Sequence, residues 1–422
     1  MRSQRMTTYI VAALVLGIVV GHVLNTTLAD TNTAARVAGY ISIFSDVFLR
    51  LIKMIIAPLV FCTLVAGVAK MGKAETIGRI GLKALGWFLA ASLISLVLGM
   101  VLVNLLQPGA SLHLPLPDAD QATNLKTSSL SLKEFVAHLV PTSIIQAMAT
   151  NEILQIVVFS LFFGIACTQI PGTEPLVKTI DKLAHIILRI TDYVMNYAPI
   201  AVFAAIAATV TTQGLGVLVT YGTFMVEFYF GIALLWVVLT LIGFAFLGGG
   251  VFRLLQLIKE PALIAFSTSS SEAAYPRLME QLEKYPVSDK IIGFILPMGY
   301  SFNLDGSMLY MTFASLFLAQ AYDIELSFGT QIVMLLTLMV TSKGIAGVPR
   351  ASLVVIAATL SSFNIPEAGV LLIMGVDQFL DMARSATNVF GNSLATTVIA
   401  HWEHEETAPS PDLLPIEEPQ TA

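Results

Sequence analysis

A polar, glycine-containing run interrupts otherwise apolar sequence at Thr341-Ser342-Lys343-Gly344-Ile345-Ala346-Gly347-Val348-Pro349-Arg350. Two similar runs precede it, Ser267-Thr268-Ser269-Ser270-Ser271-Glu272 and Asn303-Leu304-Asp305-Gly306-Ser307. Irregular backbone and charge are costly in hydrocarbon, so polar segments at membrane depth must line a site enclosed by protein. The three runs therefore predict such a site.

The apolar arms beside these runs set the topology. One run alone could be an extramembrane loop, but the arms 253–266 and 327–340 are too short to be easy full spans. Arms of this length suit helices that enter the membrane, turn and leave on the same side. We therefore expect two re-entrant hairpins, one on each side of a helix broken at 303–306, which is the pattern of inverted-repeat secondary transporters.

Composition places the chain in a membrane. Of its 422 residues 56% are hydrophobic and only 12% are charged, about half the ~25% charge of soluble domains. The net charge is −6, and six of the 28 acidic residues follow His401, so the body balances at 22 acidic and 22 basic residues. A neutral, apolar body argues against nucleic-acid partners and against intrinsic disorder.

Hydropathy and charge predict the spans and their orientation. Uninterrupted apolar candidates are 7–25, 45–69, 83–106, 151–168, 185–211 and 219–247, and the stretch 128–150 is more polar. Basic residues precede the first span and separate the second from the third, which places these ends in the cytoplasm. The acidic tail after residue 402 is predicted to be disordered and cytoplasmic.

The last apolar segment, 369–400, contains the polar residues on which the predicted function depends. Its polar residues are Asp377, Asp381, Arg384, Asn388 and Asn392. At about 100° per residue they share an arc of roughly 80°, so they form one stripe on a helix. Such a stripe could simply be an ion pair between Arg384 and either aspartate, yet ionisable residues at this depth are functional by default. The guanidinium suits a carboxylate, and a nearby aspartate suits an ammonium group.

Four segments in order give the chain a resemblance to a known family. They are the serine-rich tip 267–271, Asn303-Leu304-Asp305-Gly306-Ser307, Gly344-Ile345-Ala346-Gly347-Val348-Pro349 and Asp381-Met382-Ala383-Arg384-Ser385-Ala386-Thr387-Asn388. From about residue 10 to 402 the chain resembles the dicarboxylate/amino acid:cation symporters, the glutamate transporter family. Among the members of this family, the chain resembles the proton-coupled bacterial glutamate and aspartate carriers.

The resemblance implies an all-α integral membrane protein with eight transmembrane helices, two re-entrant hairpins and inverted repeats, assembled as a homotrimer. Residues 1–250 would form mainly the scaffold, except that the helix near 83–106 would join the transport domain. Residues 251–402 would be the transport core with hairpin 1, broken helix 7, hairpin 2 and helix 8, and 403–422 the tail. The protein would lie among the lipids of a bacterial inner membrane with both termini cytoplasmic.

The resemblance also assigns the substrate residues. Arg384 would bind the side-chain carboxylate of the substrate, Asp381 its ammonium group and Asn388 its main-chain end. The remaining contacts are expected from Ser270, Ser271, Ser307 and the backbone of 346–349, including Gly347 and Val348. Relatives that carry C4-dicarboxylates tend to have serine at the position of Asp381, so glutamate or aspartate is favoured over succinate, fumarate or malate.

The cation positions depart from the sodium-coupled pattern. Asn392 stands where sodium-coupled relatives have a carboxylate, and Phe88 and Ala91 replace a tyrosine and a threonine, so only Ser92 keeps its hydroxyl. In the second hairpin, Lys343 and Ile345 replace neutral ligands. Hard cations need charged oxygen ligands, so we expect proton coupling without a metal or organic cofactor, and sodium coupling remains the alternative.

The carrier of the proton stays open at this point. Animal relatives have a glutamate after the tyrosine of the seventh helix, whereas Met311 follows Tyr310 here. Candidates whose affinity for a proton could rise on burial are Asp305, Asp377, Asp381 and Glu272. The residues assigned to coupling are Asn303, Asp305, Lys343, Asp377 and Asn392. Arg350 either adds a second guanidinium to the site or points to solvent.

Two other classes of protein, an intramembrane enzyme and a channel, fit the sequence less well. An intramembrane enzyme is disfavoured because the six histidines show no metal-ligand spacing, and because Arg384 would keep Asp377 and Asp381 both ionised, whereas an aspartyl dyad shares a proton. A channel would conduct without coupling, whereas paired sites for an ammonium and a carboxylate favour stoichiometric binding.

Overall fold

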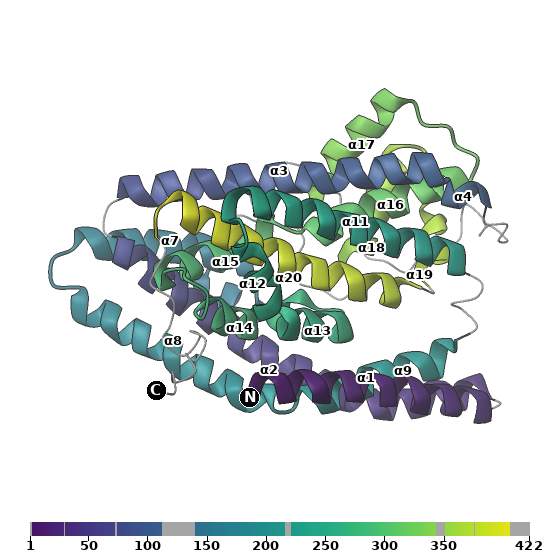
Figure 1. The fold of residues 1–422 in the computed structure, drawn as a ribbon, viewed down its shortest axis with the longest axis horizontal. Helices are drawn as coiled ribbons and strands as arrows, with labels where there is room; N and C mark the ends of the chain where they lie inside the picture. Colours follow the sequence, from purple (N-terminus) through teal and green to yellow (C-terminus); the bar gives the residue numbers. More distant parts are fainter. Residues whose placement is uncertain are drawn as a thin grey trace, which may run out of the picture.

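The computed structural model describes residues 2–28, 30–71, 74–111, 140–215, 221–342, 351–374 and 376–405, and within these ranges it contains helices and no strand (Figure 1). Within the described residues, four helical segments are each long and apolar enough to cross a membrane. They are Thr8–Thr27 in α1 (Arg2–Thr27), Thr31–Met71, which is α2, Glu75–Ala110 from α3 (Ala74–Leu106) into α4 (Pro108–Ser111), and Gly222–Leu247, which is α11. The predictions 7–25, 45–69, 83–106 and 219–247 are confirmed as apolar helices. The first three are extended at one or both ends, whereas the fourth begins at Gly222 and ends at Leu247 as predicted.

The span predicted at 185–211 is wrong as a single helix. The structure divides it into α8 (Glu174–Met195) and α9 (Ala198–Gln213), which meet at a bend of 52°. Pro199 lies in the first turn of α9, where its ring and missing N–H prevent a continuous helix. The segment 151–168 is the shorter apolar helix α7 (Ile153–Gln169), preceded by α6 (Ile144–Thr150).

The serine run forms the predicted helical turn. α13 (Lys259–Thr268) ends at Ser269, which has a left-handed φ of 51°, and α14 (Ser271–Leu282) packs back against α13. The arm 253–266 is not continuous, because α12 (Gly250–Leu257) ends before α13 begins.

The break predicted at 303–306 is confirmed. α15 (Asp289–Phe302) stops at Asn303, and α16 (Asp305–Ala321) starts after Leu304. Both intervening residues have non-helical dihedral angles. The run 343–350 lies outside the described residues, between α17 (Phe328–Thr341) and α18 (Ala351–Ser362), which contact each other.

The helix predicted over 369–400 is interrupted near its start. The structure has η2 (Glu367–Gly369), α19 (Val370–Met374) and then α20 (Asp377–Trp402). The sequence between the last two is Gly375-Val376, two residues with weak helix propensity. Asp377 therefore lies in the first turn of α20 rather than in the middle of a helix.

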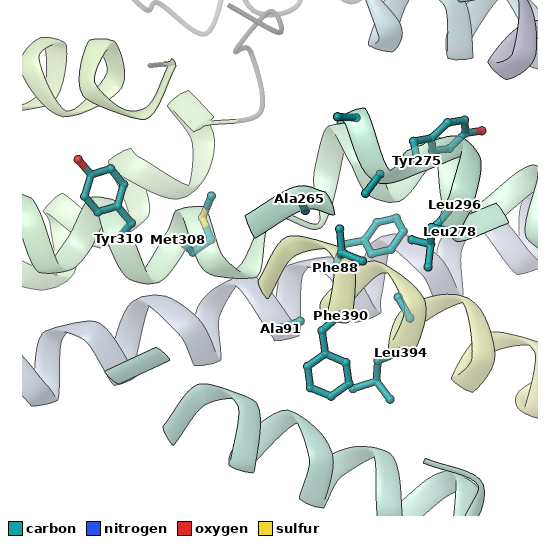
Figure 2. Packing of buried hydrophobic residues seen from close by; sticks show 14 of the residues in the cluster. Phe88, Ala91, Ala265, Tyr275, Leu278, Leu296, Met308, Tyr310, Phe390 and Leu394 are labelled. Carbon is teal, nitrogen blue, oxygen red and sulfur yellow. The ribbon is translucent and has the colours of Figure 1, made fainter. Parts of the chain in front are cut away.

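The helices form two packed groups. α1, α2, α8 and α9 pack on one another along one side, while α3, α11, α16 and α20 pack together on the other (Figure 1). α20 lies at the centre of the second group, where Phe390 and Leu394 meet Phe88 of α3 and Leu278 of α14 in one apolar core (Figure 2). This packing encloses the polar stripe of α20.

Large apolar side chains cover the outside of several helices. Val15 and Leu16 of α1, Leu89 of α3 and Val226 and Leu241 of α11 are more than half exposed. Exposed apolar area of this extent is normal for a surface in hydrocarbon and rare for one in water. The chain is therefore a membrane protein.

The C-terminal end of α20 is tied to α3 by charge. The Glu403 carboxylate, whose side chain is 3% exposed, accepts hydrogen bonds from Arg79 at 2.6 Å and Lys83 at 2.5 Å. Burial alone would raise the pKa of Glu403, but these hydrogen bonds outweigh burial and hold the pKa below its usual value. The pair of cations therefore stabilises the folded state.

We expect Glu403→Gln to lower the free energy of unfolding of the detergent-solubilised protein by about 1–2 kcal/mol, because charge-assisted hydrogen bonds are lost. The loss stays modest because Arg79 and Lys83 remain hydrated. Because folding lowers the pKa of Glu403, its ionised carboxylate stabilises the protein fully above the unfolded-state pKa of about 4.3 and loses this effect as pH falls through the lower folded-state pKa. The difference between wild type and variant should therefore begin to shrink below about pH 4 and vanish only below the folded-state pKa. Thermal unfolding against pH measures this. Glu405→Gln is the matched control, because the Glu405 side chain, which pairs with Lys290, is 30% exposed. We expect this variant to lower the unfolding temperature less than Glu403→Gln does.

Candidate functional site

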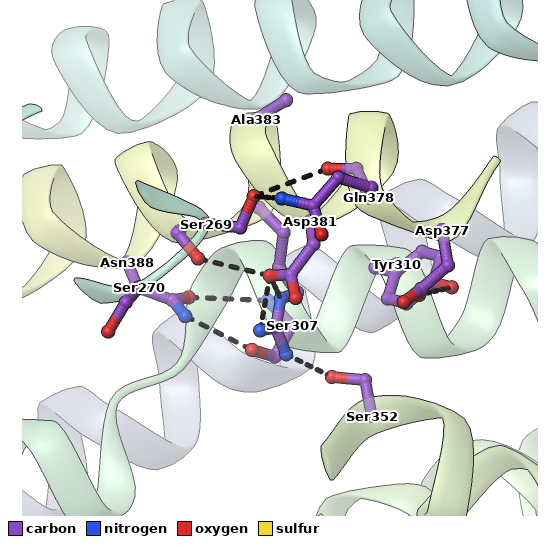
Figure 3. A network of polar contacts seen from close by, with 12 residues as sticks. Ser269, Ser270, Ser307, Tyr310, Ser352, Asp377, Gln378, Asp381, Ala383 and Asn388 are labelled. Carbon is purple, nitrogen blue, oxygen red and sulfur yellow. Dashed lines mark hydrogen bonds and ion pairs between the residues drawn. The ribbon is translucent and has the colours of Figure 1, made fainter. Parts of the chain in front are cut away.

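The five polar residues of the stripe lie inside the protein. Asp377, Asp381, Asn388 and Asn392 are buried, and the Arg384 side chain is 13% exposed. All five belong to α20, so helical spacing alone aligns them. Figure 3 shows the network in which Asp377, Asp381 and Asn388 lie, together with residues of α16, α18 and the serine run.

Arg384 and Asp381 form an ion pair one turn apart. The guanidinium Nε donates to Asp381 Oδ1 at 2.6 Å, and a second guanidinium nitrogen contacts the same oxygen. Arg384 also donates to the Ser352 hydroxyl of α18, and Ser385 donates to Asp381 Oδ1 at 3.1 Å. Of the two partners considered for Arg384 from the sequence, the structure places Asp381 against it.

Asn388 and Ser307 join α20 to the start of α16. Asn388 Nδ2 donates to Ser307 Oγ at 3.1 Å, and the Ser307 backbone N–H donates to Asn388 Oδ1 at 3.2 Å. The sequence assigned both residues to the substrate, and the structure brings them together. A buried amide held by two hydrogen bonds is a rigid element of the site.

The serine tip contacts the start of α20 through a residue not assigned from the sequence. Ser269 Oγ accepts from Gln378 Nε2 at 2.7 Å and donates to the Gln378 carbonyl at 3.3 Å. Ser270 instead caps α14, its hydroxyl oxygen accepting from the Ala273 N–H at 3.3 Å. Ser271 is the first residue of α14. Neither Ser270 nor Ser271 hydrogen-bonds Arg384 or Asp381 within the described ranges.

Asp377 is held from the broken helix. Tyr310 Oη donates to Asp377 Oδ1 at 2.7 Å, and both side chains are buried (Figure 3). The Tyr310 hydroxyl therefore holds the Asp377 carboxylate in place at the N-terminus of α20. Tyr310 was noted in the sequence only as the residue before Met311.

Three of the residues assigned to cation coupling, Asn303, Asp305 and Asn392, lie where α15, α16 and α20 meet. Asp305 is fully buried and accepts from Asn303 Nδ2 at 3.2 Å. Both side-chain polar atoms of Asn392 lack a hydrogen-bond partner among the described residues. Phe88 and Ala91 of α3 are buried and apolar. No group of three metal-ligating side chains occurs in the described part of the chain.

Several assigned residues lie outside the described residues. They are Lys343, Gly347, Val348 and Arg350, together with the rest of 343–350. Their assigned roles stay predictions. Ser352 of α18, just beyond this run, accepts a hydrogen bond from Arg384 of the stripe.

Gly391 leaves room for the Asp305 carboxylate against α20. A Cβ at this position would lie 1.9 Å from Asp305 Oδ2. We expect Gly391→Ala to displace the buried Asp305 side chain, to cost about 1–3 kcal/mol in stability and to weaken substrate binding at least tenfold. Gly86→Ala in α3 is the control, since its Cβ would meet nothing within 4 Å. Equal stability and binding in the two variants would contradict the described packing.

A membrane-embedded helical protein that keeps an arginine and several carboxylates inside its bundle belongs to the class built around a polar site for a charged ligand. A sequence model described as the sodium:dicarboxylate symporter family matches residues 6–402. The chain belongs to this family.

The curated relatives divide between two substrates. The proton/glutamate-aspartate symporter of Escherichia coli (strain K12) is 42% identical over 405 residues, which cover 94% of this chain and 92% of the relative. The C4-dicarboxylate transport protein of Citrifermentans bemidjiense is 39% identical, and the match spans 96% of this chain and 92% of that relative. The C4-dicarboxylate transport protein of Laribacter hongkongensis is 38% identical, and the match spans 94% of this chain and 89% of that relative. Membership of a symporter family makes the chain a transporter.

Proposed function

We propose that this protein takes up L-glutamate or L-aspartate together with protons across a bacterial membrane. The observation that carries the proposal is the pairing of Arg384 with Asp381 in the buried stripe of α20. A guanidinium and a carboxylate side by side offer complementary contacts to a ligand that bears both charges.

The ion pair explains how a charged substrate can enter a buried site. Without substrate, Arg384 and Asp381 neutralise each other, and Ser352 and Ser385 satisfy further hydrogen bonds. An acidic amino acid can separate the pair, because its carboxylate replaces Asp381 at Arg384 and its ammonium replaces Arg384 at Asp381. Each buried charge then keeps an opposite partner, which avoids the cost of an unpaired ion.

A C4-dicarboxylate is the second candidate, supported by relatives that are nearly as similar. Such a substrate has two carboxylates and no ammonium. Binding it to Arg384 would leave Asp381, 6% exposed, ionised beside a second negative charge. The like-charge cost favours the amino acid.

Proton rather than sodium coupling is supported by the poor oxygen ligands near Asn392. That position carries no negative charge, and the facing α3 residues Phe88 and Ala91 are apolar. Asp305 is the buried carboxylate of this region. A hard cation would meet this one carboxylate without the second one that the sodium-coupled pattern has at the position of Asn392, which leaves it poorly ligated, and the Escherichia coli relative is named for protons.

The architecture proposed for this activity has eight transmembrane helices and two re-entrant hairpins in a homotrimer, with both termini in the cytoplasm. α13 with α14 and α17 with α18 would be the hairpins. The group with α1, α2, α8 and α9 would be the fixed scaffold, and the group around α20 would move across the membrane with its substrate. The bend between α13 and α14 and the break at Asn303 support this division.

A competition experiment tests the substrate. Uptake of labelled L-glutamate is challenged with unlabelled L-aspartate and succinate at two pH values. We expect aspartate to compete at least tenfold more strongly than succinate at both. Stronger competition by succinate would move the assignment to C4-dicarboxylates.

A further inference from the structure

An apolar cavity lies between α11, α12, α13 and α20. Its volume is about 630 Å³, which is within the range of ligand-binding pockets. Small side chains of three helices line the space, namely Ala233 of α11, Ala262 of α13, and Ala383 and Ala386 of α20. At about 100° per residue, the two alanines of α20 lie roughly opposite the polar stripe. The cavity is therefore separate from the candidate substrate site.

The aromatic residues of the cavity wall have their polar atoms engaged by α20. Trp236 Nε1 donates to Thr387 Oγ1 at 2.9 Å. Tyr229 Oη donates to the Phe379 carbonyl at 2.7 Å. The two rings therefore offer the cavity mainly apolar surface. Water or an amino acid would find few hydrogen-bond partners there, whereas an apolar molecule fits.

The charged residue of the cavity wall is Lys259. It is the first residue of α13, it is exposed, and it forms no ion pair with any described residue. The neighbouring Glu260 carboxylate accepts hydrogen bonds from Arg277 at 3.0 and 2.9 Å. Phe266 also lines the cavity, seven residues further along α13, so the space extends about 10 Å along this helix. A cation at one end of an elongated apolar space suits a molecule with an anionic head and a hydrocarbon chain.

The cavity lies where membrane lipid can reach it. Ala233 and Lys259 of its wall are exposed, and Val237 and Leu241, one and two turns beyond Ala233 on α11, are more than half exposed. In Figure 1, α12 lies level with the N-terminal end of α1, the end that the basic residues predict to be at the cytoplasmic surface. Because Lys259 follows α12 closely, its ammonium group is placed near the lipid headgroups of that surface.

We propose that this cavity binds an anionic phospholipid of the cytoplasmic leaflet, with an acyl chain between α11, α13 and α20 and the phosphate at Lys259. An acyl chain gains little by leaving lipid for protein, because both are apolar. The chain therefore fills the space without selecting the headgroup, and Lys259 provides the selection. One lysine close to the headgroups gives about a fivefold preference for an anionic over a zwitterionic lipid.

Trp236 is a reporter for this site, because it lines the cavity and the chain has three tryptophans in all. The other two, Trp87 and Trp402, meet edge to face with ring centroids 5.6 Å apart, and neither lines the cavity. In full-length protein with Trp87→Phe and Trp402→Phe, the fluorescence of Trp236 is measured in phosphatidylcholine vesicles. A small, equal fraction of lipid carries mid-chain brominated acyl chains, which quench tryptophan on contact. We expect brominated phosphatidylglycerol to bind about fivefold more tightly than brominated phosphatidylcholine.

Three variants separate the headgroup from the chain. Lys259→Gln should remove the fivefold preference and leave quenching by brominated phosphatidylcholine unchanged, since the chain still fits. Ala233→Phe should fill the opening of the cavity and lower quenching by both lipids. Lys178→Gln, at an exposed lysine of α8, is the matched control and should keep the preference.

Three results would overturn the proposal. They are equal quenching by the two lipids, a preference that survives Lys259→Gln, and the absence of quenching by either lipid. The last result would show that a protein surface, such as a second copy of this chain, covers the cavity. If the double phenylalanine variant does not fold, the difference in quenching between wild type and Trp236→Phe gives the same signal. The proposal concerns lipid and not substrate, so its failure would leave the proposed function standing.

Discussion

Arg384→Ala is expected to abolish measurable uptake of L-glutamate and to weaken its binding about 10²–10³-fold. The guanidinium neutralises buried Asp381 and, in the proposed function, the substrate carboxylate. Removing one partner of a buried pair costs about 3–5 kcal/mol because the other charge is left unpaired. Binding of labelled glutamate to purified protein measures the loss directly.

Two matched variants separate the effect of the charge of Arg384 from the effects of its geometry and of a single hydrogen bond. Arg384→Lys keeps the charge but loses the planar fork, so binding should recover only in part. Ser352→Ala removes one hydrogen bond to Arg384 from α18 and should cost less than about tenfold. Near-normal binding by folded Arg384→Ala would show that the substrate carboxylate binds elsewhere.

Asp381→Ser is expected to shift the substrate preference from glutamate towards succinate. The serine has no charge for the ammonium group and leaves Arg384 without its partner, so apparent affinity for glutamate should fall about 10²-fold. Succinate has no ammonium group and would no longer meet a second negative charge. Its uptake should therefore fall far less than that of glutamate, or rise.

The comparison is made on one protein preparation with both labelled substrates. Ser385→Ala is the control, since it removes a 3.1 Å hydrogen bond to Asp381 but leaves the charge. It should lower glutamate affinity only modestly and leave the preference unchanged. Equal losses of glutamate and succinate uptake in Asp381→Ser would undo the assignment of Asp381 to the ammonium group.

The sequence predicted the main features of the fold because apolar length and polar interruption have direct physical costs in a membrane. The turn at Ser269 and the break at Asn303 lie where the runs of polar residues predicted them. The spacing of Asp381 and Arg384 likewise predicted one buried stripe, since helical geometry places such residues on one face. Ser385, one turn after Asp381, could have been found by the same spacing.

Other features depend on contacts between distant segments. Hydropathy does not register the bend between α8 and α9, although Pro199 was a local signal for it. The interruption before Asp377 left the apolar pattern of 369–400 intact. Tyr310 reaches Asp377 from 67 residues away, and Ser352 reaches Arg384 from 32 residues away. Such partners follow from packing of helices, which no local pattern contains.

Proton-coupled uptake is tested by the accumulation of labelled L-glutamate in proteoliposomes in sodium-free buffer, with and without an inward pH gradient. We expect accumulation above the external concentration only with the gradient, and we expect it to collapse when a protonophore is added. Accumulation that requires sodium and ignores the pH gradient would contradict proton coupling.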